Sequence, residues 1–501
     1  MQDSKLLKGL RNLTAKQRQR FKVYVNSAYF NQHKLSIKLL NYIYKHIDKR
    51  PQKLARELVF AVLFPGEAYE EQALFNQMSA LKKLFHRFLA QQQYEAQHFQ
   101  EDTFLLKASL DNNQYELLTN RAKQIRKKLD AYPFRDTDQH AASYSYSSTM
   151  MSYHANHGDR SKPTVFQELS TQLDRYYILE KLRHSCTLTA NQILINSRYD
   201  LGLLEDVLRY VETHIDDLQE DGEHSILLHY TILMSMRDSE NPAHYQLLKS
   251  MLRDKIHCFN NADKGTLYLA ANNYCVRQIN NGYSEFRKEL FDLYKEGLRT
   301  ELILQNGVLN EWSYKNITAL GCSLSDWEWT EQFLEDYREK LPKHTQENSY
   351  NYNMAHLNIK KKRYDVARDH LLQVRFSDVK YHLNYNILLM STYYALDDME
   401  ALLSLIDTFR IYVMRSKKIT VDQKRQYTNF LRFARKLTLI KQTPRAYGED
   451  PKEIKFAQLY LQIRDSKNIV NRYWLESTCQ QEAGNYLDEV LAKAEAQAEA
   501  Q

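Results

Sequence analysis

Glycine and proline are scarce in this chain, which contains only 12 glycines and 8 prolines among 501 residues. Globular proteins use roughly 7% Gly and 5% Pro, because turns and loops depend on their backbone geometry. β-Sandwiches, barrels and doubly wound α/β folds join many short elements through such turns. The chain is therefore predicted to be all-α. Its hydrophobic content of 43% excludes disorder over most of the length.

A period of 34 residues runs through the second half of the chain. Three series repeat with this interval: Gly321, Ala355 and Leu389; Phe333, Ala367 and Ala401; and Tyr337, Leu371 and Leu405. The tetratricopeptide repeat has this period, with small residues where its two helices cross and with neighbouring pairs stacked side by side. The pattern predicts an α-solenoid of antiparallel helix pairs, with three pairs at about 314–347, 348–381 and 382–415.

Composition and helix breaks predict five segments. They are a basic N-terminal module of four helices (1–95), a divergent array of helical hairpins (96–313), the tetratricopeptide-like repeats (314–415), C-terminal capping helices (416–486) and a solvated Ala/Glu/Gln-rich tail (487–501). Breaks between helices are expected near Gly202, Asp221-Gly222, Asn241-Pro242, Gly265, Asn281-Gly282 and Asn306-Gly307. Capping boxes are expected at Thr14 to Gln17 and, after a linker at 159–163, at Thr164 to Gln167. Residues 141–158 lack Asp, Glu, Lys and Arg, which fits a loop or, as we favour, a helix buried between its neighbours.

Positive charge is concentrated in two stretches, although the net charge is only +7. Residues 1–60 hold 14 Lys/Arg against three acidic residues, and 410–445 hold 11 against Asp422 alone. Such asymmetry fits either nucleic acid or an acidic partner, or simply solvated helix backs. The N-terminal stretch is the better candidate, because aromatic residues on which bases could stack alternate with its charges. The predicted phosphate-contacting residues, all expected at the surface, are Lys16, Arg18, Arg20 and Lys22.

Motifs for catalysis, cofactors and metals are absent from the sequence. It has no Walker loop, G-x-G-x-x-G, G-x-S-x-G or H-E-x-x-H pattern. His154 and His157 could share a metal on a helix, with Asp159 nearby, but no third ligand follows from the sequence. We therefore expect a non-enzymatic protein with no catalytic residue, cofactor or metal. Scattered cysteines, an N-terminus without a signal-peptide core and the lack of long apolar runs predict a cytoplasmic protein without membrane insertion.

The concave face of the repeats is the predicted partner-binding surface, because helical-repeat proteins use such faces for recognition. In the register of Gly321, Ala355 and Leu389, this face carries Lys315, Thr318, Tyr352, His356, Lys360, Asn386, Met390, Tyr393 and Tyr394. Such an aromatic, mildly basic groove suits an extended or helical peptide. Alternatively, its tyrosines, among 36 in the chain, pack between neighbouring helices.

Several short motifs resemble a family of helical, tetratricopeptide-like proteins of Bacteroidota whose function is uncharacterised. They are Tyr29-Phe30-Asn31, Phe64-Pro65-Gly66, Met78-Ser79 with Leu81, Asn273-Tyr274-Cys275 with Ile279-Asn280, Trp312 to Asn316, and Tyr473-Trp474-Leu475. The resemblance covers about residues 1–480 and implies no activity. Some tetratricopeptide proteins bind a peptide carboxylate through Lys and Asn at the positions of Tyr352 and His356, so that mode of binding is not expected here.

Two functions remain as the main hypotheses. The first is a scaffold or adaptor that binds a protein or peptide partner. The second is a nucleic-acid-associated protein that uses the basic N-terminal module and residues 410–445. An unrecognised hydrolase, or a regulator that senses a small peptide, is a third hypothesis.

Overall fold

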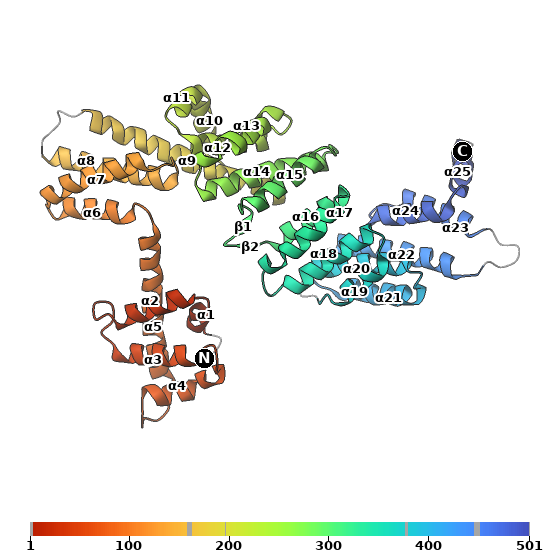
Figure 1. Ribbon diagram of the computed structural model, residues 1–501, viewed down its shortest axis with the longest axis horizontal. Helices are drawn as coiled ribbons and strands as arrows, with labels where there is room; N and C mark the ends of the chain where they lie inside the picture. Colours follow the sequence, from red (N-terminus) through yellow and green to blue (C-terminus); the bar gives the residue numbers. More distant parts are fainter. Residues whose placement is uncertain (1–3, 158–162, 196, 376–378, 445–450, 500–501) are drawn as a thin grey trace. The chain divides into compact units, whose positions relative to one another are not determined.

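The structure is a computed structural model that describes residues 4–157, 163–195, 197–375, 379–444 and 451–499 (Figure 1). These residues are predominantly α-helical, as the scarcity of Gly and Pro predicts, with one short β-hairpin. The chain divides into two compact units, formed by residues 1–237 with 255–260 and by residues 238–254 with 261–501. Within the described ranges, no helix combines the length and the apolar character that crossing a membrane requires.

The first unit contains twelve of the described α-helices and two short 3-10 helices. They are α1 (Lys5–Arg11), α2 (Ala15–Asn26), α3 (Lys34–His46), η1 (Pro51–Leu54), α4 (Arg56–Leu63), α5 (Glu71–Ala96), α6 (Gln100–Asp111), α7 (Tyr115–Ala131), α8 (Thr137–Asn156), α9 (Pro163–Ile195), α10 (Leu204–Thr213), α11 (Ile215–Glu220), α12 (His224–Arg237) and η2 (Ile256–Cys258).

The N-terminal module has five helices, one more than expected. α1 was missed because it is only seven residues long, yet its three leucines are buried in the module's core beside Phe21 and Phe85. The capping box that begins α2 is confirmed. Thr14 Oγ1 accepts from the Gln17 amide at 3.3 Å, and Gln17 Oε1 accepts from the Thr14 amide at 2.9 Å.

The uncharged segment at 141–158 is helical, as favoured, because α8 extends to Asn156. The prediction for Thr164 was wrong: α9 begins at Pro163, so Thr164 lies inside the first turn and is not the N-cap. Proline suits that first position because the amide it lacks would have no partner within the helix. The expected linker is outside the described residues, apart from Pro163.

The second unit contains thirteen of the described α-helices, one 3-10 helix and a β-hairpin. They are α13 (Pro242–Asp254), α14 (Asn261–Asn280), α15 (Phe286–Arg299), β1 (Leu304–Gln305), β2 (Val308–Leu309), α16 (Glu311–Ser323), α17 (Trp327–Asp336), η3 (Arg338–Lys340), α18 (Gln346–Lys360), α19 (Tyr364–Leu372), α20 (Val379–Ala395), α21 (Met399–Arg415), α22 (Val421–Gln442), α23 (Lys452–Asp465), α24 (Arg472–Ala483) and α25 (Tyr486–Glu499).

Two expectations in this unit need correction, at Gly265 and at the C-terminal tail, whereas the break between helices expected near Asn306-Gly307 is present. Gly265 lies within α14 and breaks no helix. Asn306 and Gly307 form the turn of the β1–β2 hairpin, with φ angles of 53° and 77°. Positive φ at both central residues defines the type I′ turn, for which Asn-Gly is the preferred sequence. The expected solvated tail is largely α25, whose Leu487 and Val490 pack against the core of the C-terminal helices.

The three predicted helix pairs are present as α16–α17, α18–α19 and α20–α21. The first helix of the middle pair, α18, packs against both α16 and α20. In each pair the turn between the helices has one residue with positive φ, at Ser325, Lys362 and Asp397. The amide of the following residue donates to a carbonyl five residues earlier in each turn, as in a Schellman motif. Corresponding turns therefore recur after 37 and then 35 residues, not after 34.

This spacing shifts the predicted repeat register. When positions are counted from the positive-φ residue of each turn, two sets of residues are equivalent in the three pairs. On the first helices they are Thr318, Ala355 and Met390, and on the second helices they are Thr330, Ala367 and Leu402. All six are completely buried. The 34-residue series was therefore offset by three residues in the first pair and by one in the third. The physical reason is that the loops between pairs differ in length: after α17 the chain forms η3 before α18 begins.

Candidate functional site

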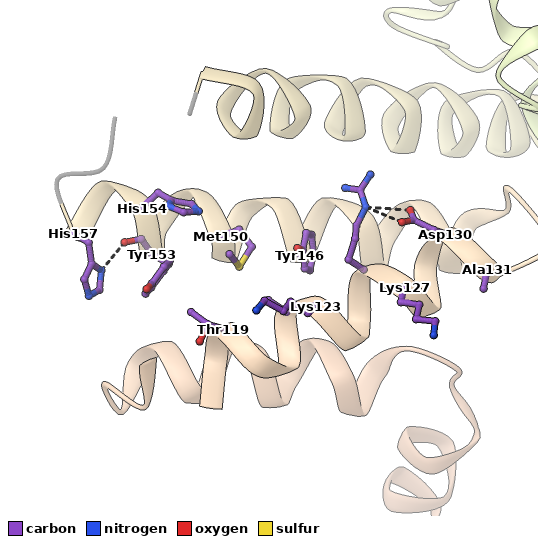
Figure 2. A pocket seen from close by; sticks show the side chains of 12 residues that line it. Thr119, Lys123, Lys127, Asp130, Ala131, Tyr146, Met150, Tyr153, His154 and His157 are labelled. Atoms are coloured by element: carbon purple, nitrogen blue, oxygen red, sulfur yellow. Dashed lines mark hydrogen bonds and ion pairs between the residues drawn. The ribbon is translucent and has the colours of Figure 1, made fainter. Parts of the chain in front are cut away.

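A groove of about 900 Å³ lies between α7 and α8 in the first unit (Figure 2). Figure 2 shows Tyr146, Met150 and Tyr153 extending from α8 toward α7, which carries Lys123 and Lys127 along the other wall. The complete lining is Thr119, Ala122, Lys123, Arg126, Lys127, Asp130, Ala131, Tyr146, Met150, Tyr153, His154 and His157. The groove therefore places an aromatic wall opposite a basic wall.

The aromatic wall arises from helical spacing within the uncharged segment. Tyr146, Met150, Tyr153 and His157 follow at intervals of four, three and four residues, which aligns them along one face of α8. The first three are half-buried, because each packs against the small core between α6 and α7 while leaving part of its surface in the groove. Ala122, with its short side chain, lies in the lining between the two walls.

One end of the groove is an aromatic cluster. The His157 ring lies 4.4 Å from the ring centroids of both Tyr115 and Tyr153. His157 Nδ1 is 2.8 Å from the carbonyl oxygen of Tyr153. Because a carbonyl only accepts, Nδ1 carries the proton and Nε2 remains an acceptor in the neutral ring. This exposed imidazole can thus accept a hydrogen bond from a ligand.

The basic wall contains both paired and unpaired charges. Arg126 is paired with Asp130 at 3.1 Å and with Glu168 on α9. Lys123 and Lys127 are exposed and have no ion-pair partner in the described part of the chain. Two positive charges are therefore available along this wall to an acidic ligand.

A buried ion-pair network positions α8. His140 Nε2 lies 2.9 Å from Glu223 Oε2, and Arg175 Nη1 on α9 lies 2.9 Å from Glu223 Oε1. The side chains of His140 and Glu223 are 1% and 0% exposed, and Arg175 also pairs with Asp221. Breaking such a buried pair costs about 3–5 kcal/mol, because the remaining charge loses its partner. The network thus fixes the α8 wall against α9 and the turn before α12.

The predicted residues of the first two repeats lie together on α16 and α18. Lys315 Nζ is 5.5 Å from the ring centroids of both Trp312 and Tyr352. Burial lowers the pKa of Lys315. Burial, together with Lys360 and Lys315, lowers the pKa of the half-buried His356 to about 4. The cluster is therefore a packed cation–aromatic contact, with Lys360 exposed at its edge.

Five residues of the predicted partner-binding face are buried, so the structure does not present them to a ligand: Thr318, Tyr352, Asn386, Met390 and Tyr394. The Thr318 hydroxyl donates to the Tyr314 carbonyl at 2.8 Å, and the Asn386 amide donates to the His382 carbonyl at 2.7 Å. Tyr394 donates to Glu482 at 2.9 Å, within the core of the C-terminal helices. Tyr393 is half-buried against the cluster formed by Ala355 and Ala367, and Met390 is completely buried.

The shifted register explains this outcome. The structural counterparts of Tyr352 are Lys315 and Ile387, whereas Thr318 and Met390 correspond to the fully buried Ala355. The predicted surface therefore combined positions that are not equivalent in the three helix pairs.

The predicted nucleic-acid residues of α2 do not form one face. Lys16, Arg20 and Lys22 are exposed, but Arg18 is not the free surface residue expected, because it binds Asp48 and donates to the Arg11 carbonyl. Arg20 lies 3.5 Å from Glu95. Residues two positions apart in an α-helix differ by about 200° around its axis, so Lys22 lies almost opposite Arg20.

A different part of the N-terminal module combines aromatic and basic side chains. A cleft of about 570 Å³ separates the loop after α2 from α5. Tyr29 in this loop is 86% exposed, and Lys83 and Arg87 lie one turn apart on α5, without ion-pair partners among the described residues. Asn31 holds the loop, since its buried amide donates to the Val25 and His33 carbonyls.

The possible metal site gains no third ligand. His154 is buried and His157 exposed on the groove, while Asp159 is outside the described residues. Among the residues that are described, no group of three or more His, Cys, Asp or Glu side chains could hold a metal ion.

No protein-family model and no curated protein sequence matches the chain. The resemblance to the tetratricopeptide-like family therefore stays a prediction.

Apart from His154 and His157, which were considered as metal ligands, sequence reasoning missed the groove residues on α7 and α8. The signal was present in the four-three-four spacing of Tyr146, Met150, Tyr153 and His157 within an uncharged helix. The sequence did not show that α7 leaves this face partly open.

Proposed function

We propose that this protein is a non-enzymatic, cytoplasmic scaffold or adaptor of helical repeats, and that it binds an acidic, partly apolar peptide segment of a protein partner in the α7–α8 groove. The observation that carries the proposal is the pairing of two unpartnered lysines, Lys123 and Lys127, with an aromatic and Met-lined wall. Carboxylates fit the first wall and apolar side chains fit the second.

The length of the groove favours a peptide over a small metabolite. Its lining extends from Thr119 to Ala131 on α7 and from Tyr146 to His157 on α8. At about 1.5 Å per residue, each wall is roughly 16–18 Å long. That length matches five extended residues or about three helical turns. Half-buried tyrosines supply large contact areas with little loss of side-chain entropy, as in peptide-binding surfaces.

Site-specific photo-crosslinking tests the proposal. A photoreactive phenylalanine derivative replaces Tyr146 in the groove or, as the matched control, the exposed Phe104 on α6. We expect one partner to be crosslinked through position 146 and not through position 104. Mass spectrometry of the crosslinked peptide should identify an acidic segment. The same products at both positions, or a basic segment at 146, would contradict the proposal.

Charge reversal then measures the contribution of the basic wall. Lys123→Glu with Lys127→Glu should weaken binding of the identified peptide by at least about tenfold in fluorescence anisotropy, since two favourable charge pairs become unfavourable. Lys107→Glu with Arg121→Glu, at exposed positions outside the groove lining, changes the net charge equally. This control should bind like the unmodified protein.

A second candidate function, nucleic-acid association, is supported by the cleft of the N-terminal module. Tyr29 offers an exposed ring for base stacking beside Lys83 and Arg87, which could contact successive phosphates. Binding of a fluorescent single-stranded RNA should weaken steeply with salt and should be lost in Lys83→Glu with Arg87→Glu. Lys16→Glu with Lys22→Glu is the control with equal charge.

Affinity purification with and without nuclease separates the two functions. A stoichiometric protein that survives nuclease supports the adaptor. Material lost after nuclease treatment supports the second candidate.

A further inference from the structure

The hairpin of α21 and α22 ends in a surface that combines aliphatic and basic side chains. Ile411, Met414 and Val421 are 51%, 56% and 85% exposed. Single exposed aliphatic residues are common on proteins and need no explanation, but a contiguous group marks a contact surface. We name the group formed by these three residues and their basic neighbours the hairpin patch.

Contacts across the hairpin show that the aliphatic residues share one surface. Lys424 Nζ donates to the Met414 carbonyl at 2.9 Å, and the Thr428 hydroxyl lies 4.0 Å from Met414 Sδ. Val421 precedes Lys424 and Thr428 by three and seven residues and so shares their face of α22. Ile411 lies one turn before Met414 on α21. The aliphatic side chains therefore follow the seam of the hairpin toward its end.

The connecting segment is held firmly, so the exposure does not result from a loose loop. Ile419 is buried in the core of the C-terminal helices. Thr420 and Gln423 form a capping box that begins α22, with Val421 as its first residue. Ile419 anchors this segment in the core, so the side chain of Val421 is held in solvent. Nothing in the described structure covers it.

The basic neighbours give the hairpin patch a strong positive charge. They are Arg410, Arg415, Lys417, Lys418, Lys424 and Arg425. Asp422 is the one acidic residue between 410 and 425, and it lies 3.8 Å from Arg425. Arg410, Arg415, Lys417 and Lys418 are exposed and have no ion-pair partner within the described ranges. An excess of five positive charges therefore surrounds the three aliphatic side chains.

We propose that the hairpin patch binds peripherally to the surface of an anionic phospholipid bilayer. Lysine and arginine are attracted to anionic headgroups, while aliphatic side chains enter the boundary between headgroups and acyl chains. This combination of groups is present here at the end of a rigid hairpin. A bilayer surface with anionic headgroups satisfies both kinds of side chain.

Charge and side-chain type disfavour two other occupants, a second copy of the chain and a nucleic acid. A second copy of the chain would bring like charges together across the contact, which opposes association. A nucleic acid would satisfy the basic residues, but its bases stack on aromatic rings, and the exposed apolar residues of this patch are aliphatic. A spanning segment is not required, because the contact is made by a surface.

Vesicle co-sedimentation of the full chain tests the proposal. Vesicles of phosphatidylcholine with 30% phosphatidylserine are compared with vesicles of phosphatidylcholine alone. We expect binding to the first and little to the second, with a decrease at high salt. Lys417→Glu with Lys418→Glu should weaken binding by at least about 25-fold, because each basic residue near an anionic surface contributes roughly fivefold.

Serine variants separate aliphatic insertion from charge attraction. Ile411→Ser, Met414→Ser and Val421→Ser together should weaken binding by about tenfold or more. Leu247→Ser, Leu269→Ser and Leu372→Ser remove aliphatic groups elsewhere that are 49%, 60% and 60% exposed, and should have no effect. Val421→Ser alone, at the most exposed position, should give an intermediate loss without affecting folding.

Three results would each overturn the proposal. One is equal binding to neutral and anionic vesicles. Another is a hairpin triple variant that binds like the control triple variant. The third is RNA or duplex DNA binding that depends on Lys417 and Lys418 while anionic vesicles do not bind, which would assign the hairpin patch to nucleic acid.

Discussion

The close contact at Gly321 provides the sharpest test of how the repeat helices pack. A Cβ atom at Gly321 would lie closer than 3.0 Å to Thr330 Oγ1 on the partner helix α17 and 3.3 Å from the Phe291 ring. Thr330 is completely buried, and its hydroxyl donates to the Asp326 carbonyl at 2.6 Å, so it cannot move aside without losing that bond. Gly321→Ala therefore forces α16 and α17 apart.

The expected loss follows from two opposing terms. Overfilling a packed contact costs about 1–3 kcal/mol, whereas replacing Gly by Ala in a helix gains up to about 1 kcal/mol. The net effect of Gly321→Ala should be a loss of about 1–2 kcal/mol. Gly265→Ala is the matched control, because Gly265 is also helical but nothing lies within 4 Å of its added Cβ. This substitution should stabilise by about 0.5–1 kcal/mol.

Tryptophan fluorescence can follow this pair locally during urea unfolding. Trp312 lies in α16 and Trp327 and Trp329 lie in α17, so three of the four tryptophans report on the contact. Trp474→Phe removes the remaining signal. A local probe is needed because a chain with two compact units need not unfold in one transition.

A second substitution identifies the cause. Thr330→Ala removes the overlapping hydroxyl, so Gly321→Ala should cost about 1 kcal/mol less in that background. Thr330→Val keeps the volume and should give no rescue. If Gly321→Ala proved as stable as the unmodified protein, or if Thr330→Val rescued it, close helix approach would not be the reason for glycine at this position.

Three further predictions concern the turns, pH and the buried ion pairs. Lys362→Gly should stabilise by about 1 kcal/mol in urea unfolding, because glycine adopts the φ of 59° freely, whereas Lys360→Gly, inside α18, should destabilise by a similar amount. His356 has a pKa lowered by burial to about 4, so the unfolded chain gains a proton first as the pH falls below about 6.5. His356 alone should then decrease the free energy of unfolding by up to about 1.4 kcal/mol per pH unit down to pH 4. In urea titrations at each pH, His356→Gln should reduce the slope by this amount and leave the part due to His229, whose pKa burial also lowers to about 4. Glu223→Ala should cost about 3–5 kcal/mol and increase hydrogen exchange in α8, because His140 loses its buried partner.

The fold class was predictable because it depends on local backbone preference summed over the chain. The exact repeat register was not. Gly321 is as small as a helix crossing requires, which is why it fitted the 34-residue series. Its structural counterpart in the next pair, however, is Asn358, because the carbonyl oxygen of each accepts the 6→1 hydrogen bond of its turn. A fixed period cannot detect η3, which lengthens one loop between pairs. Left-handed residues such as Lys362 also conceal the turns, because glycine is the usual signal there.

The candidate groove was predictable in part. The aromatic spacing on α8 follows from the sequence, and so does its helical character. Which face of α8 stays open depends on how α6 and α7 pack against it. A short side chain such as Ala122 at their contact leaves space that no single-helix pattern reveals.

The basic surfaces rank differently when all basic residues are counted than when only basic residues without an ion-pair partner are counted. In the N-terminal module Arg18 pairs with Asp48 and Arg56 with Glu71, so part of its excess stabilises the fold. At the α21–α22 hairpin, Lys417 and Lys418 have no such partner in the described structure. A carboxylate in contact reduces the field that an external phosphate or carboxylate experiences, whereas an unpaired lysine retains it. Three surfaces therefore carry unpaired positive charge: the α7–α8 groove, the cleft at Tyr29 and the hairpin patch. The apolar side chains beside this charge are aromatic in the first two and aliphatic in the third.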